Sequence, residues 1–399
     1  MTIRQSRRRM LKGIAASAGV AAASTILPVR FAIGQAAKIK LGLMLPYTGT
    51  YAALGKNIDD ALKLAIAEGG GKLGSRDIEY AVVDDESEPA KATENATKLV
   101  TRDKVDILIG TVHSGVAAAM VKVAADNNTL LVIPNAGVGA ATGPLCAPNI
   151  FRTSFSNWQP AFAMGKVAAE RGQKRAVAIS WDYAAGKEST GGFKEGFEAG
   201  GGKVESELYL PFPQVEFQAL LTQIGSLKPE VVYAFFAGGG AVSFVKDYFA
   251  AGLRKSIPLV GPGFLTDGTL QAQGESAQGL ETTLHYADGL DIPKDKSFRA
   301  AFKSAANREA DVYAVQGYDT GQLLVAGLGA VKGDVGARDA LVAAMEKTTI
   351  DSPRGKFTLS KAHNPIQDIY LRKAEGLENK YVSIAVKALA DPARGCKMA

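Results

Sequence analysis

The amino-acid sequence predicts an α/β protein made of two doubly wound, Rossmann-like lobes with parallel sheets. Short apolar runs alternate with longer amphipathic runs through most of the chain, which is the pattern of strands joined by crossover helices. The chain has 399 residues, enough for two domains at roughly 150 residues each. With 47% hydrophobic and 22% charged residues it can bury a large core. This composition excludes a disordered, collagen-like or coiled-coil protein.

The first lobe is predicted from the runs that begin at Ile39. Apolar runs predict strands, and longer runs with apolar residues every three or four positions predict helices. In the helix over 115–127, Val116, Met120 and Val123 fall on one face. The predicted strands are Ile39–Leu45, Ile78–Asp84, Ile107–Ile109 and Leu130–Ile133, and the predicted helices cover 53–68, 89–102 and 115–127.

The second lobe is predicted from a similar series after an extended connection over 150–157. Its predicted helices cover 160–171, 191–199, 217–227 and 241–251, and its predicted strands cover 176–180, 203–209, 231–236 and 259–261. Helices over 296–307, 313–331 and 337–347 follow without strands between them, so we expect them to cover the first sheet. Strand-like runs over 366–374 and 381–388 are expected to return to the second sheet.

The first 36 residues have the layout of an export signal: a basic start, an Ala/Gly-rich apolar stretch and small residues. The Ser-Arg-Arg-x-x-Leu-Lys run is similar to a twin-arginine signal, and a general secretory signal is the alternative. A membrane anchor would need roughly 18 apolar residues, which are not present between Lys12 and Arg30. Cleavage is expected after Gly34 or Ala36, and the mature protein is expected in the periplasm.

The positive charge of the chain belongs to this leader. The formal charge is +6, and the leader holds six basic residues and no acidic one, which leaves 40 basic and 40 acidic residues. These six are Arg4, Arg7, Arg8, Arg9, Lys12 and Arg30. A neutral mature protein without a later Lys/Arg-rich run gives no reason to expect nucleic acid as a partner.

The loops after the predicted strands combine Gly or Pro with hydrogen-bonding or aromatic side chains. Ligands of open α/β sheets bind beyond the carboxyl ends of the strands, where helix N-termini also point. These loops are Pro46-Tyr47-Thr48-Gly49, Gly110-Thr111-Val112-His113-Ser114, Pro134-Asn135-Ala136-Gly137, Trp181-Asp182-Tyr183, Ala237-Gly238-Gly239-Gly240 and Gly261-Pro262-Gly263-Phe264. If the two lobes face each other, these loops line one cleft.

With these loops, the chain resembles the periplasmic solute-binding proteins of ABC importers, of the leucine/isoleucine/valine-binding type. The resemblance also rests on Val83-Asp84-Asp85-Glu86, Phe151-Arg152-Thr153 and Ala250-Ala251-Gly252-Leu253. It implies a type I periplasmic-binding fold with a hinge of three crossovers, near Phe155, Tyr286 and Asn364, that closes on a ligand. The implied segments are 37–156 and 286–365 for the first lobe, and 157–285 and 366–399 for the second.

The resemblance also implies roles for single residues. Ser114 matches a serine that binds the ligand carboxylate, Gly137 replaces a threonine with the same role, and Asn135 supplies the carbonyl that receives an ammonium. The acidic partner of that ammonium aligns with Gly263. Because a buried ammonium needs a counter-charge, an α-amino acid fits poorly.

The resemblance leaves room for an aromatic ligand. Two positions that are aromatic in the family align with Ala185 and Ala237, which widens the pocket. Aromatic residues that could line it are Tyr47, Trp181, Tyr183, Phe236, Phe264 and Tyr313, the last matching a ligand-lining aromatic of the family. A planar benzoate-type carboxylate is therefore the expected ligand, with His113 as a further donor. A branched-chain or other aliphatic amino acid, with Asp182 as counter-charge, is the alternative.

Each of these residues also has a structural interpretation. Ser114 at a helix start is explained equally by N-capping, His113 by a structural hydrogen bond, and Asn135 by support of its turn. The tyrosines and phenylalanines are explained equally by ordinary packing.

Other chemistry has little support. The Gly238–Gly240 run lacks a dinucleotide fingerprint, and three histidines and two cysteines show no metal-ligand spacing. A hydrolase that uses Ser114 lacks a base and an oxyanion hole, so we predict no enzyme, no cofactor and no metal. We expect a monomer that delivers its ligand to a membrane ABC permease, with a sensory subunit as another possibility.

The two cysteines are expected to form a disulfide, because exported proteins commonly pair them. Cys146 lies just before the first implied crossover and Cys396 near the C-terminus. The usual disulfide of the family cannot form, since its positions are occupied by Ser87 and His113. The bond Cys146–Cys396 would tie the tail near the hinge.

Overall fold

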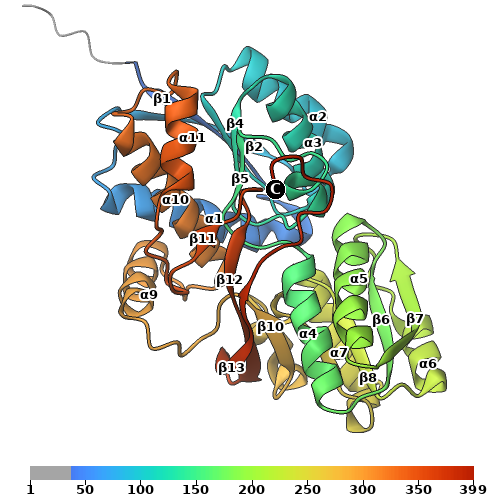
Figure 1. Ribbon diagram of the computed structural model, residues 1–399. Coiled ribbons are helices and arrows are strands. Elements are labelled where there is room, and N and C mark those ends of the chain that lie inside the picture. The colour runs from blue at the N-terminus through green and yellow to red at the C-terminus, as the bar shows by residue number, and fades with distance from the viewer. Residues whose placement is uncertain (1–36) are drawn as a thin grey trace, which may run out of the picture. The chain divides into compact units, whose positions relative to one another are not determined.

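The protein is described by a computed structural model over residues 37–399, which contains two β-sheets flanked by helices (Figure 1). The predicted export signal over 1–36 lies outside the described residues. The predicted α/β class with two lobes is confirmed. Short 3-10 or π turns lie at Gly49–Tyr51, Lys98–Arg102, Gly139–Thr142, Leu253–Lys255, Gly263–Leu265 and Gly274–Ala277.

The first sheet has the strand order β2-β1-β3-β4-β5 and is parallel throughout. Its strands are β1 (Ile39–Leu45), β2 (Ile78–Asp84), β3 (Ile107–Ile109), β4 (Leu130–Ile133) and β5 (Ile150–Arg152). The prediction that 150–157 is only a connection is wrong at its start, because Ile150–Arg152 pairs with β4 as an edge strand. Ile150 and Phe151 are buried there, so the strand belongs to the core of this lobe.

Helices cover both faces of the first sheet. They are α1 (Ala52–Glu68), α2 (Pro89–Thr97), α3 (Ser114–Asp126), α10 (Val312–Ala330) and α11 (Arg338–Glu346). Leu323 of α10 and Leu341 of α11 share one apolar cluster with Ile39 and Ile107, which confirms that these late helices return to the first sheet (Figure 1). The helix α9 (Pro293–Ala306) does not cover the first sheet in this way. Its Phe298 packs instead against Tyr318 of α10.

The second sheet has the order β11-β12-β10-β9-β8-β6-β7, and β13 pairs with β12. Its strands are β6 (Arg175–Trp181), β7 (Lys203–Leu210), β8 (Val231–Phe235), β9 (Leu259–Pro262), β10 (Glu281–Leu284), β11 (Thr358–Leu359), β12 (Pro365–Glu375) and β13 (Glu378–Leu389). The late strands β12 and β13 join this sheet, as predicted, and their pairing, which was not predicted, is antiparallel. The short strand β10 was not predicted, because only one of its four residues is a large apolar one.

The helices of the second lobe are α4 (Trp158–Glu170), α5 (Ala184–Ala199), α6 (Gln218–Leu227), α7 (Gly238–Ala250) and the short α8 (Leu270–Gln273). The helix α5 begins seven residues before the predicted start at 191. Its first turns contain Gly186, which packs so closely on strand β6 that a Cβ atom there would lie 1.9 Å from the Trp181 carbonyl oxygen.

Two buried arginines hold the segments that connect the lobes. Arg152 donates to the side chain of Asn364 at 2.7 Å and to the carbonyl of Val138 at 2.7 Å. Arg354 pairs with Asp319 at 2.9 Å and donates to the carbonyl of Ser154 at 3.1 Å. The connecting segments are therefore fixed by buried charge-assisted hydrogen bonds.

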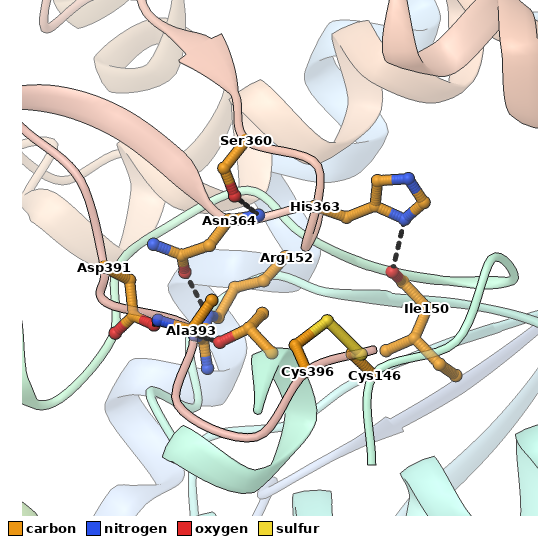
Figure 2. The surroundings of a disulfide bond; sticks show 10 residues. Cys146, Ile150, Arg152, Ser360, His363, Asn364, Asp391, Ala393 and Cys396 are labelled. Atoms are coloured by element: carbon orange, nitrogen blue, oxygen red, sulfur yellow. Dashed lines mark hydrogen bonds between the residues drawn. A yellow bond between two sulfur atoms is a disulfide. The ribbon is translucent and has the colours of Figure 1, made fainter. Parts of the chain in front are cut away.

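The predicted disulfide Cys146–Cys396 is present, with 5.5 Å between its Cα atoms. Figure 2 shows the tail from Asp391 through Ala393 to Cys396 lying beside Arg152 and Asn364. The tail also packs on the loop before Cys146, because a Cβ atom on Gly143 would lie 2.8 Å from the Arg394 carbonyl oxygen. The bond thus anchors the C-terminal tail to the first lobe.

Candidate functional site

A cavity lies between the lobes, beyond the carboxyl ends of β3, β4, β6, β8 and β9. Six of the predicted site residues line it, namely Ser114, Asn135, Gly137, Tyr183, Phe264 and Tyr313. Its other lining residues are Tyr51, Leu54, Val112, Phe155, Asn157, Ala185, Phe235 and Ala237. The two alanines stand where the sequence resemblance places aromatic residues.

Six of the fourteen residues that line the cavity are aromatic. The ring centroids of Phe155 and Phe264 are 4.7 Å apart, and those of Phe264 and Tyr313 are 6.2 Å apart. The ring centroid of Tyr183 lies 6.3 Å from that of Phe235, the last residue of the neighbouring strand β8. These distances suit tilted and edge-to-face ring contacts, so the walls can take a flat aromatic group.

One end of the cavity is polar and begins with the N-terminus of α3. The helix begins at Ser114, and the N-cap is His113, whose Nδ1 accepts the backbone N–H of Gly115 at 3.1 Å. The alternative that Ser114 is itself the N-cap is therefore wrong. The N–H groups of Ser114 and Val116 have no partner within the helix, which makes this end suitable for an anion.

The hydroxyl of Ser114 is held as a donor toward the cavity. Its oxygen accepts a hydrogen bond from the side-chain amide of Asn157 at 3.2 Å. The same amide nitrogen donates to the carboxylate of Glu188 at 2.7 Å, which also accepts the N–H of Gly139 at 3.0 Å. Because the Ser114 oxygen already accepts, its own hydrogen is available to a ligand carboxylate.

Gly137 lies at the same end, and only glycine fits there. A Cβ atom at this position would lie 2.5 Å from Oδ1 of Asn157 and 2.7 Å from its backbone nitrogen. The threonine that the sequence resemblance places here could not be accommodated. This position can thus contribute only its backbone to a ligand.

The groups that would receive an α-ammonium are missing. The carbonyl oxygen of Asn135 accepts the hydroxyl of Ser154 at 3.0 Å, and the Asn135 side chain donates to Gln316 at 2.7 Å. At Gly263 a Cβ atom would lie 2.4 Å from the guanidinium of Arg372, which donates to the Gly263 carbonyl at 3.0 Å. The guanidinium of Arg372, which is paired with the carboxylate of Asp267, therefore occupies the space beside Gly263 where an amino acid would require a carboxylate of its own.

The hydroxyl of Tyr313 is another polar group of the walls. It is buried, and no hydrogen-bond partner is found for it within residues 37–399. Burial, with Asp267 and Asp311 nearby, raises the pKa of Tyr313 well above its ordinary value. The phenol therefore stays protonated and can donate to a ligand.

Four predicted residues do not line the cavity. Trp181 and Phe236 are completely buried and pack on each other at 5.1 Å, because side chains alternate along a strand and these two point away from the cleft. Tyr47 packs against the core, and His113 lies behind Tyr183 with 4.7 Å between the ring centroids. The alternative counter-charge Asp182 is also absent from the walls and pairs with Lys187 at 2.7 Å.

The two lobes touch across this cavity. The hydroxyls of Tyr51 and Tyr183 are 3.1 Å apart, and the stacked rings of His113 and Tyr183 join α3 to α5. Residues of both lobes therefore contribute to the walls of the cavity. In the described part of the chain no His, Cys, Asp and Glu cluster could hold a metal ion.

The chain is similar in sequence and in structure to known proteins. A family model described as periplasmic binding protein matches residues 38–379. The chain belongs to the periplasmic binding protein family. A relative named Leu/Ile/Val-binding protein homolog 6, from Brucella melitensis, is 30% identical over 342 residues, which cover 84% of this chain and 87% of the relative.

Solved structures of this binding-protein family are also similar. A solute-binding protein of an ABC transporter from R. palustris, in complex with benzoate, is 52% identical, with a TM-score of 0.88, and the match covers 90% of this chain and all of the other. One from Rhodopseudomonas palustris BisB5, in complex with 3,4-dihydroxybenzoic acid, is 32% identical with a TM-score of 0.83, over 89% and 99% of the two chains. This periplasmic binding protein is therefore the solute-binding protein of an ABC transporter.

Several wall residues of this binding protein were not predicted from its sequence. Tyr51, Phe155 and Asn157 lie outside the strand-end loops, in a short turn and in the connection between the lobes. Phe235 precedes Phe236, and the sequence does not show which of the two faces the cleft. The run Phe155-Ser156-Asn157 beside a predicted crossover was the one available signal.

Burial of His113 predicts a pH effect on stability. Burial lowers the pKa of the His113 ring from 6.5 to about 4, because the charged ring loses its contact with water. Between these values the unfolded chain binds the proton more readily, so the stability from the neutral ring is complete above pH 6.5 and is lost toward pH 4. We expect a loss of about 3 kcal/mol over this range.

The variant His113→Asn keeps an N-cap acceptor but does not titrate, so it isolates this effect. The free energy of unfolding, measured by denaturant titration, should fall between pH 7 and 4 by about 3 kcal/mol more in the unchanged protein than in the variant. Buried carboxyls such as Asp85, whose pKa is raised to about 6, have the opposite sign but act in both proteins. If the difference in unfolding free energy between the two proteins does not vary with pH, the lowered pKa of His113 is contradicted.

Proposed function

We propose that the protein captures a small aromatic carboxylate of the benzoate type between its lobes and delivers it to a membrane ABC permease. The observation that carries the proposal is a cavity with aromatic walls and one polar end. That end offers a hydroxyl donor and helix N–H groups, which suit a carboxylate. The relatives in complex with benzoate and 3,4-dihydroxybenzoic acid support the same class of ligand.

Within this proposal each wall has a role. The hydroxyl of Ser114 and the backbone of Gly137 would bind the ligand carboxylate, and Asn135 would border it. The rings of Tyr183 and Phe264 would enclose the ligand ring, and the Tyr313 hydroxyl would donate to a ring substituent. His113, Tyr47, Phe236 and Trp181 would support these walls from behind.

A branched-chain amino acid is the second candidate, because curated relatives carry the name Leu/Ile/Val-binding protein homolog. The ammonium of such a ligand would meet Arg372 behind Gly263 and a carbonyl of Asn135 that already accepts Ser154. Desolvating an ammonium without a carboxylate partner costs several kcal/mol. The geometry thus favours a carboxylate without an amino group.

Capture would follow from hinge closure and would break no bond. The ligand would favour the closed arrangement, in which both lobes contact it, over an open one. The proposed segments are 37–156 and 286–365 for the first lobe and 157–285 and 366–399 for the second. We further propose a monomer, exported by a twin-arginine signal that is cleaved after Gly34 or Ala36. No enzyme activity is proposed, since Nδ1 of His113 accepts an N–H and gives Ser114 no base.

Calorimetric titration of the purified protein with benzoate, 4-hydroxybenzoate and leucine tests the proposal. We expect binding of the aromatic acids and none of leucine. Ser114→Ala should weaken benzoate binding by at least about tenfold, because it removes a hydrogen bond to a charged group. Ser226→Ala, on the surface of α6, serves as the matched control. Leucine binding without benzoate binding, or an unchanged affinity in Ser114→Ala, would overturn the assignment.

A further inference from the structure

A second cavity, of about 290 Å³, lies beside the C-terminal tail and shares no lining residue with the first. One wall is the helix α5, which presents Gly191 and Gly192, and another is the tail with Asp391 and Pro392. Gly191 faces open space, since a Cβ atom there would meet nothing within 4 Å, whereas Gly192 packs against the backbone of Trp158. The hollow is thus large enough for a small organic molecule.

The charged groups around this cavity do not balance. Its walls hold the carboxylates Glu188, Glu195 and Asp391, and one cation, Arg394. The guanidinium of Arg394 forms an ion pair with the carboxylate of Glu195 at 2.8 Å. Behind the walls, the buried guanidinium of Arg152 interacts electrostatically with the carboxylates of both Asp391 and Glu188. Three carboxylates thus stand against two guanidinium groups, and burial raises the pKa of Glu188, an effect that a cation beside this carboxylate would oppose.

Two further features indicate an organic cation. Ser156 is a lining residue of the cavity and only 1% exposed, and its buried hydroxyl has no hydrogen-bond partner in the described part of the chain. It can accept from an ammonium group. The indole of Trp158 adds an aromatic surface of the kind that attracts alkylammonium groups. The described residues contain no group of ligands suited to a metal ion.

We propose that this cavity binds a small organic ammonium ion, with Glu188 and Asp391 as its counter-charges and Ser156 and Trp158 as its other contacts. The tail that carries Asp391 is fixed by the disulfide Cys146–Cys396, so the bond maintains one wall of the site (Figure 2). Reduction of the disulfide should therefore weaken ammonium binding.

The site is connected to the first cavity through Glu188. This carboxylate accepts from Asn157, which in turn donates to Ser114. A cation beside Glu188 would offset its negative charge behind the anion-binding end. If the proposed carboxylate binding is correct, on which this consequence rests, each ligand should strengthen the other by the same factor, about fivefold.

The test uses choline as the probe and its neutral isostere 3,3-dimethylbutan-1-ol as the control, titrated calorimetrically into the purified protein at constant ionic strength without benzoate. We expect saturable binding of choline and none of the alcohol. Asp391→Asn should weaken choline binding at least about tenfold, because it removes a counter-charge. Gly191→Leu should fill the cavity and abolish binding, whereas Gly191→Ala should retain it.

The proposal is overturned if choline does not bind at millimolar concentration, or if Asp391→Asn and Gly191→Leu bind it as the unchanged protein does. Circular dichroism shows whether Gly191→Leu folds, and Asp391→Asn decides the question if it does not. Because benzoate is absent from this titration, a failure of the proposed carboxylate function leaves its result unaffected. Choline binding that benzoate does not alter would contradict the connection through Glu188.

Discussion

We expect Arg354→Met to lower the free energy of unfolding by about 3 to 5 kcal/mol, because it breaks a buried ion pair on one side only. The side chains of Arg354 and Asp319 are 1% and 0% exposed, and Nε lies 2.9 Å from the carboxylate. Removing the cation leaves the carboxylate buried without a counter-charge. It also leaves the carbonyl of Thr153 without its guanidinium donor, and the carbonyl of Ser154 with the side-chain amide of Gln367 as its remaining donor.

Urea titration of Arg354→Met measures this loss. Lys356→Met is the matched control, since this neighbouring cation is exposed and should change stability by less than about 0.5 kcal/mol. Adding Asp319→Asn to Arg354→Met should recover part of the loss, because the variant no longer buries an unpaired charge. A loss below 1 kcal/mol, or losses that simply add in the double variant, would show that the pair does not hold the connection.

The elements of both sheets could be predicted where an apolar run is long enough to be seen by itself. The strands Ile39–Leu45 and Ile78–Asp84 have the predicted bounds, and so do Ile107–Ile109 and Leu130–Ile133. The strand β10 could not be predicted, since Glu281, Thr282 and Thr283 lack the apolar character of a buried strand. Its place is set by pairing with β9 and β12, which depends on residues far away in the chain.

The candidate site could be predicted as a set of loops but not as a set of side chains. Parallel strands place their carboxyl ends at one edge, so the loops with Ser114, Asn135 and Gly137 were found from the pattern. The direction of the side chains could not be predicted in the same way, because Trp181 and Phe236 point into the core. The replacement of an acid by Gly263 is explained only by Arg372, which reaches this position from β12, 109 residues further along the chain.

Removal of the disulfide has the second large effect that we expect. The double variant Cys146→Ser, Cys396→Ser should lose about 2 to 5 kcal/mol of unfolding free energy. The bond joins positions separated by 250 residues, so it restricts most of the unfolded chain. Native packing around the bond remains, because the tail is still held by the ion pair of Arg394 with Glu195.

Two measurements separate the disulfide from the tail contacts. Arg394→Gln, which breaks only the exposed ion pair with Glu195, should lose less than about 1 kcal/mol in the same denaturant titration. The double cysteine variant should lose several times more, and treatment with a reductant should lower the stability of the unchanged protein to that of the variant while leaving the variant unaffected. Two free thiols found by mass spectrometry of the untreated protein, or equal stability of the double variant and the unchanged protein, would contradict this account. Because a cross-link acts through the unfolded chain, the loss should be accompanied by a larger dependence of the unfolding free energy on urea concentration, since the chain without the bond exposes more surface on unfolding.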